Sequence, residues 1–402
     1  MLRQESGSAA THSTQRHDRR ILVITKSDTR IPRDGGSLRT RAIVDQLSGR
    51  GHDVKVVAVN GRPPASGRPA VGQMWRALAL LVQTIPQLVR YPAYSLAKWV
   101  SWGVLLDLAD RSNERRDLPT IIDSSQLAVY LPLCRRVIGL SLHNVEHELL
   151  ANYATSGSSR LRRVVAAHDA RVMRRFEKHL MELCLPVFVV SDHDRDLLIA
   201  ICPGARVVVA TNGVAGECFR SASSRTCSVV FIAHLGWQPN IDASVWLVRS
   251  VWPHVAASVP EATLLLVGRS PARAVWALES RSVSIIPDVE SVIPYVSAAR
   301  VATAPLLSAG GTRLKILEAV ACGTPVVATP LGALGLESAF DSRVLRVQSD
   351  PILFANEIIE LLRADCSSEA SFSCREQARP FEWANSLAPM MQDLELTLDD
   401  SP

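Results

Sequence analysis

Hydrophobic and polar positions follow two different periods along most of the chain. Near the start, an apolar run at 21–25 and a run at 52–59 that alternates and then becomes wholly apolar flank a segment whose apolar residues recur at helical spacing between 38 and 47. The order strand, helix, strand predicts a parallel βαβ unit. Because the strands are apolar over most of their length, we expect a sheet that is covered by helices on both faces.

The same order of elements starts again in the second half. Helical spacing at 242–256 and at 312–322 separates further strand-like runs, which lie at 229–232, 263–267, 284–286, 301–304 and 325–328. Two such series predict an α/β chain with two doubly wound, Rossmann-like domains. We expect a disordered tail over 1–19, an N-terminal domain over 20–214, a linker over 215–227, a C-terminal domain over 228–379 and a C-terminal helix with its tail over 380–402.

A long apolar segment, residues 73–110, lies within the first series. Charged residues and prolines at 76, 86, 90, 92 and 98 interrupt it, so no window reaches the ~20 apolar residues that a membrane-spanning helix needs. We therefore expect a pair of packed helices. The alternative is a helix pair on a membrane surface, with peripheral contact through residues 73–108.

Composition narrows the classes of function. Of the 402 residues 47% are hydrophobic and 5% aromatic, and the formal net charge is +5. The hydrophobic share excludes global disorder, and the mild charge with few aromatic residues argues against a nucleic-acid partner. The eight cysteines form no C-x-x-C pair, so we expect reduced thiols and no metal site. A cytoplasmic protein follows, peripheral at the inner face of the membrane if the apolar segment touches it.

The block from Ala304 to Thr329 holds the most informative motif. A predicted strand leads to Gly310 and Gly311, and a predicted helix starts at Thr312. Glycines let the backbone approach a ligand, and the first helical N–H groups attract an anion. The basic residues Arg313 and Lys315 follow in the first helical turn, where the helix dipole alone would favour acids. This pattern indicates an anion site, although a plain turn with solvated cations would look the same.

Glu318 follows Lys315 by three residues, on the same side of the predicted helix. A carboxylate one turn behind an anion site is well placed to accept hydrogen bonds from a ribose diol. The alternative is a surface ion pair with Lys315, worth a few tenths of a kcal/mol. Because the residues around Glu318 are apolar, the site is the favoured interpretation.

His143 ends a further apolar run, 137–142. The carboxyl edge of a parallel sheet is where α/β proteins bind ligands, so His143 is a candidate site residue. A lone histidine at such a position is more often structural, but Asn144, Glu146 and His147 follow it directly.

In their order and spacing, several short motifs together resemble the family-4 retaining glycosyltransferases of the GT-B fold, from Ile21 to about Leu394. They are Asp34-Gly35-Gly36, Gly51-His52-Asp53-Val54, His143-Asn144-Val145-Glu146, Asn212-Gly213-Val214, Trp237-x-Pro239-Asn240, the 310–323 block and Phe381-x-Trp383. The resemblance implies two Rossmann-like domains that face each other across a cleft. It also implies transfer of a sugar from a nucleotide diphosphate donor to a hydroxyl acceptor, with retention, in the synthesis of a cell-surface polysaccharide or glycoconjugate.

The resemblance assigns roles residue by residue. Glu318 matches the glutamate that holds the nucleotide ribose. Gly35 and Gly36 match the loop that approaches the donor phosphates from the N-terminal domain. His143 matches a histidine that faces the donor sugar.

Two departures mark a divergent subgroup. The family's paired acids stand eight positions apart, and the first would fall on Gly310; its role passes to the backbone amides of Gly310, Gly311 and Thr312. The loop 233–237 lacks the usual arginine and lysine. Charge compensation for the diphosphate then falls to Arg313 and Lys315, with His234 as a helper.

The expected mechanism needs no cofactor and no metal. No D-x-D motif follows the predicted strands at 21–25 and 301–304, which lead to the glycine pairs, so we expect the protein itself to stabilise the leaving diphosphate. We expect Arg313, Lys315 and the helix amides to do so while the acceptor hydroxyl attacks the same face of a hexose. The acceptor is a sugar, a lipid-linked sugar or a small molecule.

Three alternatives remain open. A dinucleotide-dependent oxidoreductase would need G-x-G-x-x-G after a strand, and neither glycine pair has that spacing. A nucleotide-sugar epimerase would share the fold and act on the donor alone. A catalytically degenerate GT-B module, which binds a nucleotide sugar or a partner glycosyltransferase, would fit Gly310 and the loop 233–237.

Overall fold

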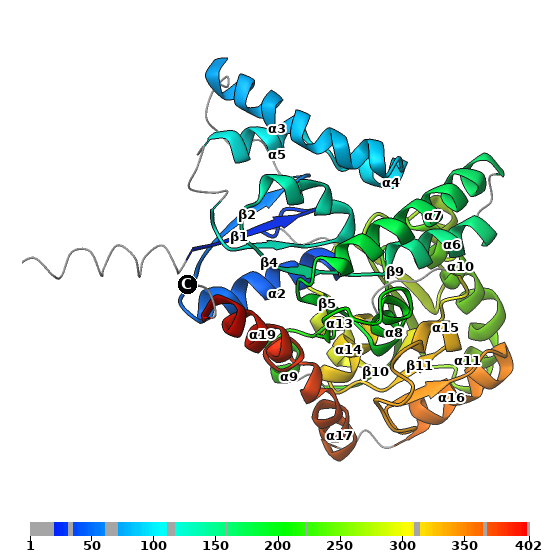
Figure 1. The fold of residues 1–402 in the computed structure, drawn as a ribbon. Coiled ribbons are helices and arrows are strands. Elements are labelled where there is room, and N and C mark those ends of the chain that lie inside the picture. The colour runs from blue at the N-terminus through cyan, green and yellow to red at the C-terminus, as the bar shows by residue number, and fades with distance from the viewer. Residues whose placement is uncertain are drawn as a thin grey trace, which may run out of the picture. The chain divides into compact units, whose positions relative to one another are not determined.

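The computed structural model describes residues 20–30, 35–60, 71–110, 117–156, 160–221, 224–308, 314–364 and 368–399. The expected tail over 1–19 lies outside this part of the chain. The chain divides into two compact units, which we call unit 1 (Met1–Thr211 with Leu387–Pro402) and unit 2 (Asn212–Ser386). Each unit is built on a parallel six-stranded sheet with helices around it (Figure 1).

Unit 1 has the strand order β2-β1-β3-β4-β5-β6. Its strands are β1 (Arg20–Thr25), β2 (Asp53–Ala58), β3 (Thr120–Ile122), β4 (Val137–Ser141), β5 (Val187–Val189) and β6 (Val207–Val209). Its helices are α2 (Gly35–Gly49), α3 (Val71–Arg90), α4 (Tyr94–Ala97), α5 (Trp102–Asp110), the 3-10 helix η1 (Ser125–Leu133), α6 (Glu146–Ser156), α7 (Arg160–Glu182), α8 (Asp192–Ile201) and α19 (Ala388–Asp399).

The apolar strands of unit 1 are covered on both faces, as the sequence predicts. Residues 21–24 of β1 are fully buried. Leu22 and Ile24 belong to a core cluster that includes Leu80 of α3 and Leu105 of α5. Figure 1 shows α3 and α5 on one side of the sheet and α2 on the other. The end of the chain also belongs to this unit, where α19 packs on β4 and β6.

Unit 2 has the strand order β12-β11-β10-β7-β8-β9. Its strands are β7 (Thr226–Ile232), β8 (Thr263–Gly268), β9 (Val283–Pro287), β10 (Ala299–Ala304), β11 (Val326–Ala328) and β12 (Leu345–Val347). Its helices are α9 (Gly216–Arg220), α10 (Gln238–Trp246), the π-helix η2 (Leu247–Val251), α11 (Trp252–Ser258), α12 (Arg273–Trp276), α13 (Ile293–Ala298), α14 (Leu314–Ala321), α15 (Pro330–Ala333), α16 (Pro351–Arg363), α17 (Ser368–Ala378), the 3-10 helix η3 (Arg379–Phe381) and α18 (Trp383–Ser386).

Taken in chain order, the strands of unit 2 have the spatial order 3-2-1-4-5-6 of a dinucleotide-binding Rossmann fold. The core between this sheet and its helices holds Phe231, Leu264 and Phe354. The segment 215–227, which we expected to be a linker, contains α9 and the first residues of β7.

Several element boundaries differ from the sequence prediction. The expected helix over 381–396 is divided into η3, α18 and α19. It is interrupted because the backbone of Val214 pairs with this segment: its N–H donates to the carbonyl oxygen of Phe381, and its carbonyl oxygen accepts from the N–H of Trp383. The helix expected from 242 starts at Gln238, where Pro239 suits a first helical turn. Helix α3 continues through Pro86, which we expected to interrupt it.

Candidate functional site

Each sheet has one place where the strand order reverses, and such switch points are where α/β sheets bind ligands at the carboxyl ends of their strands. In unit 1 the reversal lies between β1 and β3, and in unit 2 it lies between β7 and β10. Most of the predicted site residues that the structure describes lie in the loops and helices that follow β1, β7 and β10.

Lys315 lies on α14, the helix that follows β10. Its Nζ atom is 3.4 Å from Oδ1 of Asn240, at the start of α10, and 4.9 Å from the ring centre of Phe231 in β7. Asn240 in turn donates from Nδ2 to the carbonyl oxygen of His234, 3.0 Å away. The ammonium group of Lys315 therefore lies at the β7 side of the switch point, and Asn240 connects it to the loop 233–237.

The backbone around this edge of unit 2 is tightly packed. A Cβ atom at Gly268, the last residue of β8, would lie 1.7 Å from the carbonyl oxygen of Ala233. A Cβ atom at Gly332, in α15, would lie 2.0 Å from the carbonyl oxygen of Ala304, the last residue of β10. Both glycines are required for these close approaches, which hold the loops after β7 and β10 in place.

Glu318 lies one turn after Lys315 on α14 and is partly buried. Burial raises its pKa, the positive charge of Lys315 lowers it, and the negative charge of Glu217 raises it; the net result is a pKa of about 7. A carboxyl group with a pKa near neutrality changes its charge in the physiological range, which is common among groups that contact ligands.

The other donor-side predictions have different outcomes. Gly310, Gly311, Thr312 and Arg313 lie outside the described residues. His234 is described and exposed, and its carbonyl oxygen accepts the hydrogen bond from Asn240. The helix predicted over 312–322 is described from Leu314 to Ala321.

In unit 1, Gly35 and Gly36 are the first residues of α2, which follows β1. No acidic residue stands in this first turn, so the N–H groups at the helix start keep their partial positive charge. The structure therefore places the predicted glycine pair at a helix start beside the switch point of unit 1.

His143 follows β4 and forms a close pair with Asp123, which follows β3. The Nε2 atom of His143 lies 2.7 Å from Oδ1 of Asp123. Oδ2 of Asp123 accepts hydrogen bonds from the hydroxyl groups of Thr40 (2.5 Å) and Thr25 (3.0 Å). Burial alone would raise the pKa of Asp123, but the His143 ring and these hydrogen bonds together hold the pKa below its usual value.

Arg39 is a fully buried cation on α2. Its Nη1 atom donates to the carbonyl oxygen of Thr211, 2.9 Å away. Burial lowers its pKa to about 10, while the nearby carboxylates of Asp123 and Asp194 act in the opposite direction. The buried charge of Asp123 thus has a cationic neighbour as well as its hydrogen bonds.

A second group of polar residues lies at the same edge of unit 1. Lys26, after β1, lies 3.2 Å from Oε1 of Glu146 and covers the ring of Trp99 at 5.1 Å. The other carboxylate oxygen of Glu146 accepts from Nε2 of Gln126 at 3.1 Å. Hydrogen-bonding groups therefore lie next to an aromatic ring at this edge.

Glu177 of α7 fixes the position of this second group of polar residues through hydrogen bonds. It is fully buried and accepts hydrogen bonds from Nδ1 of His147 (2.6 Å) and from the hydroxyl of Ser125 (2.9 Å). The backbone N–H groups of Glu146 and His147 also donate to it. These bonds fix the start of α6 and hence the position of the Glu146 side chain.

Sequence reasoning missed Asp123, Thr40, Lys26 and Gln126 as site residues. Asp123 carried a usable signal, because Ile121 and Ile122 form an apolar pair directly before a polar run. The strand β3 has only three residues, which is too short for a period to stand out.

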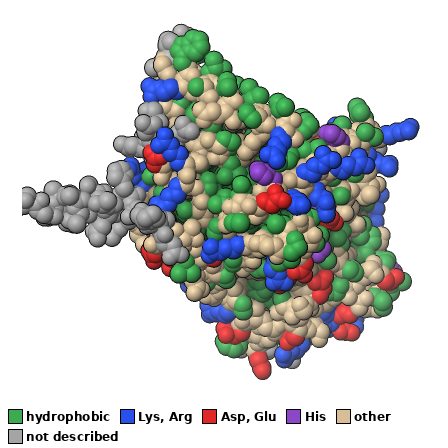
Figure 2. All heavy atoms as spheres, viewed as in Figure 1, with side chains coloured by type: hydrophobic (Ala, Val, Ile, Leu, Met, Phe, Trp, Pro, Cys, Tyr) green, Lys and Arg blue, Asp and Glu red, His purple; other side chains and the backbone are tan. Residues whose placement is uncertain are grey.

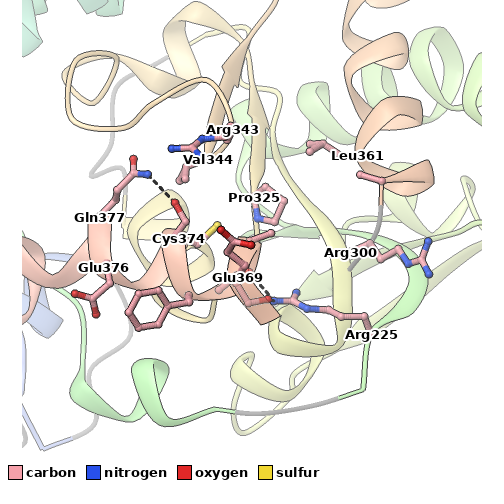
Figure 3. A pocket seen from close by; sticks show the side chains of 16 residues that line it. Arg225, Arg300, Pro325, Arg343, Val344, Leu361, Glu369, Cys374, Glu376 and Gln377 are labelled. Carbon is pink, nitrogen blue, oxygen red and sulfur yellow. Dashed lines mark hydrogen bonds between the residues drawn. The ribbon is translucent and has the colours of Figure 1, made fainter. Parts of the chain in front are cut away.

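A cavity of about 540 Å³ in unit 2 lies away from these residues (Figure 3). It is bounded by Arg225, Arg300, Val344 and residues 369–377 of α17, at the amino ends of β7, β10 and β12. Arg225 donates to the carbonyl oxygens of Ala299 and Gly323 and to the hydroxyls of Thr324 and Ser371. Its guanidinium group therefore fastens the loops and α17 together.

The described residues show neither a metal-binding cluster nor a membrane-spanning helix. No three His, Cys, Asp or Glu side chains there lie close enough together to hold a metal ion. Nor does any helix in the described ranges have the length and apolar character needed to cross a membrane.

The fold is that of known sugar-transferring enzymes. An α,α-trehalose-phosphate synthase (UDP-forming) from Burkholderia xenovorans has a similar structure, with a TM-score of 0.60 and 12% sequence identity. The similarity covers 94% of this chain and 100% of that one. The chain has the GT-B fold. TarM of S. aureus, in a complex with UDP and α-GlcNAc-glycerol, is also similar, with a TM-score of 0.55 and 13% identity over 73% of this chain and 59% of TarM.

Two sequence matches agree with the GT-B fold. Residues 226–364 match the family model described as glycosyl transferases group 1, and they contain both Lys315 and Glu318. An uncharacterized 44.6 kDa protein in the cps region of Klebsiella pneumoniae is 24% identical over 142 residues, which is 33% of this chain. The match spans 36% of that relative's length. Together with the fold, these matches support a glycosyltransferase.

Proposed function

We propose that this protein is a retaining glycosyltransferase that moves a hexose from a nucleotide diphosphate donor to a hydroxyl group of a sugar or lipid-linked acceptor. The product would belong to a cell-surface polysaccharide or glycoconjugate. One observation carries the proposal: Lys315 and Glu318 lie on α14 at the switch point of unit 2, inside the segment that matches glycosyl transferases group 1.

Unit 2 would bind the donor. The ammonium group of Lys315 lies within the first turns of α14, so it can bind the diphosphate together with the helix N–H groups. In this proposal Gly310, Gly311 and Thr312 supply backbone amides and Arg313 a second cation, with His234 beside them. Glu318, one turn deeper, would accept hydrogen bonds from the ribose hydroxyls. UDP in TarM is consistent with a nucleotide of this class.

Unit 1 would bind the acceptor. The N–H groups of Gly35 and Gly36 at the start of α2 suit a phosphate oxygen. His143, held by Asp123, would face the transferred sugar, and the pair Lys26–Glu146 would bind acceptor hydroxyls. The location of the K. pneumoniae relative in a cps region supports a polysaccharide as the product.

The proposed chemistry uses the protein's cations instead of a metal. The bond between the sugar C1 and the donor phosphate oxygen breaks, and the acceptor oxygen forms a new bond to C1 on the same face. The acceptor's proton passes to the leaving phosphate oxygen. Negative charge grows on the diphosphate as that bond breaks, so Lys315, Arg313 and the helix amides stabilise the transition state more than the ground state. Activity should therefore persist in EDTA.

The reduced cysteines support a cytoplasmic location. The described cysteines are all thiols, including Cys218, Cys322 and Cys374, which are buried. Proteins of oxidising compartments usually contain disulfides, whereas cytoplasmic proteins keep their thiols.

Calorimetric titration with UDP, GDP and ADP tests the proposal first, in the wild type and in Glu318→Gln. We expect one nucleotide to bind and the variant to bind it at least about tenfold more weakly. Turnover is then measured with the matching nucleotide sugars and an acceptor panel, and NMR of the product reads the anomeric configuration. Binding without turnover would support the degenerate module, and an epimerised donor without acceptor would support an epimerase. Failure of all three nucleotides to bind would remove the proposal.

A further inference from the structure

Helix α3 has two apolar faces. Ala77, Leu80 and Thr84 are buried against the core of unit 1. The residues of the outer face are large, apolar and exposed at spacings of three and four: Trp75, Leu78, Val82, Ile85 and Val89. A surface helix normally places polar residues on its outer face, so an apolar outer face indicates a partner.

Aromatic side chains continue this face beyond α3. Tyr94 of α4 is 68% exposed and Trp102 of α5 is 42% exposed. Tyrosine and tryptophan are enriched where a protein meets the boundary between lipid headgroups and acyl chains, because their rings are apolar and carry one polar group. We call the exposed apolar side chains of α3, α4 and α5 the apolar face.

The charged residues of α3 and α4 and of the turns after them are all basic. Residues 71–106 contain Arg76, Arg90 and Lys98 and no aspartate or glutamate. All three cations are exposed, and the long apolar stems of such side chains can lie along lipid while the charge stays at the headgroups.

Helix α7 extends the basic rim. Asp169 accepts the backbone N–H groups of Tyr94 and Ser95, and His168 bonds to the carbonyl oxygen of Pro92, so α7 lies directly against α4. The exposed residues of its first turns alternate between apolar and basic: Arg160, Leu161, Arg162, Arg163, Val164 and Val165. Figure 2 shows hydrophobic side chains along α3 and Lys and Arg side chains over α7.

We propose that the apolar face is a docking surface for an anionic lipid bilayer, with α3 lying in the plane of the headgroups. A self-associating pair of chains would bring the same cations together across a symmetric interface, which is unfavourable. An anionic bilayer matches both the apolar residues and the charge. This surface brings the proposed acceptor residues of unit 1 to a membrane, where a lipid-linked acceptor is held.

The proposal goes beyond sugar transfer and does not depend on it. Vesicle binding is measured with the full chain in the absence of donor and acceptor. Loss of catalytic activity would therefore leave the docking result unchanged, and absence of docking would leave nucleotide binding unchanged.

Co-sedimentation with vesicles tests the surface. The chain should bind vesicles of phosphatidylcholine and phosphatidylglycerol at low salt, and much more weakly vesicles of phosphatidylcholine alone. The triple variant Trp75→Gln, Val82→Gln, Val89→Gln should lose at least about tenfold in affinity, because each side chain would otherwise enter the interface. These residues are 67%, 56% and 73% exposed, so thermal unfolding should stay at the wild-type temperature.

Two further variants make the test specific. Ile352→Gln, Leu353→Gln, Phe372→Gln removes three comparably exposed apolar residues from unit 2 and should bind vesicles like the wild type. Arg76→Gln, Arg90→Gln, Lys98→Gln should lose about fivefold per charge on anionic vesicles, following about 1 kcal/mol for each basic residue near the surface.

Three results would overturn the proposal. The first is no binding to anionic vesicles at low salt. The second is equal binding by the wild type and the α3 triple variant. The third is a wild-type dimer that the triple variant converts to a monomer while neither protein binds vesicles, which would make the face a contact between two copies.

Discussion

His143 and Asp123 form a buried pair across the ends of two neighbouring strands, with 2.7 Å between Nε2 and Oδ1. In the neutral imidazole this contact places the proton on Nε2, because the carboxylate can only accept. Nδ1 then carries the lone pair; it is buried and has no hydrogen-bond partner among the described residues. Asp123 therefore determines both the tautomer and the direction of the ring, and it is a positioning residue for His143.

Asp123→Asn should lower kcat by about ten- to a hundredfold while the KM for the nucleotide sugar changes little. The amide is nearly the same size, but it no longer fixes the Nε2–H tautomer of His143. Steady-state kinetics checks this by reading kcat and KM separately. Asp117→Asn is the control, because Asp117 is exposed and pairs with the exposed Arg135 instead of with His143. An unchanged kcat with reduced protein stability would assign Asp123 a structural role only.

Glu177→Gln should reduce the free energy of unfolding by about 1–3 kcal/mol. Glu177 is a buried acceptor for two side chains and two backbone N–H groups, and an amide can satisfy only some of them. Urea denaturation measures the change. Glu182→Gln on the same helix is the matched control, because its carboxylate is half exposed and lies 3.8 Å from Lys178, so it should change stability by a few tenths of a kcal/mol at most.

Lys315→Ala should reduce kcat by about two orders of magnitude, since its charge would stabilise the leaving diphosphate in the transition state. Lys315→Arg should recover part of the loss, because it keeps the charge near Asn240. Nucleotide affinity, measured by calorimetry, should fall less than kcat. Equal losses in affinity and in turnover would mean that Lys315 only binds the donor, and near-normal turnover in the alanine variant would exclude it from the mechanism.

The long apolar runs were sufficient to predict the two parallel sheets. The buried residues 21–24 of β1 illustrate why: their burial on both faces leaves a continuous apolar run that no amphipathic helix would have. By contrast, β3, β5, β6 and β12 have three residues each and were not predicted, whereas the equally short β11 lies in the predicted run 325–328.

Site residues were predictable only where the chain places them next to a recognisable element. His143 ends a clear strand, and Glu318 follows the Gly310-Gly311 pair in the sequence, so both could be named from the sequence. The partners of His143 come from residues 25, 40 and 123 of the chain, and only the strand order brings them together. The sequence also could not predict that helix α3 continues through Pro86, because packing of its inner face on the core holds the helix together.

The charge of Glu318 should control donor affinity through its pKa of about 7, which burial raises, Lys315 opposes and Glu217 supports. The ionised carboxylate accepts hydrogen bonds from ribose hydroxyls better than the protonated form. Affinity for the nucleotide sugar should therefore be highest above pH 7 and fall by up to about tenfold per pH unit below it. Calorimetry between about pH 5.5 and 8 measures this with a nucleotide sugar, whose diphosphate does not change charge in that range.

Two substitutions identify Glu318 as the group that titrates. Glu318→Gln should bind more weakly than the wild type at pH 8 and show no pH dependence. Glu217→Gln removes an exposed like charge, so the midpoint of the affinity curve should move to lower pH. A Glu318→Gln variant with the wild-type pH dependence would contradict the assignment.

The raised pKa of Glu318 also predicts the direction in which the free energy of unfolding changes with pH. A carboxyl group whose pKa is raised on folding binds more protons in the folded than in the unfolded protein, between its ordinary pKa of about 4.3 and its folded value. The free energy of unfolding should therefore fall as the pH rises through this window and level off above pH 7. In Glu318→Gln this decline should be smaller. Urea denaturation without ligand measures this decline. The result therefore tests the burial of Glu318 separately from its contact with a nucleotide.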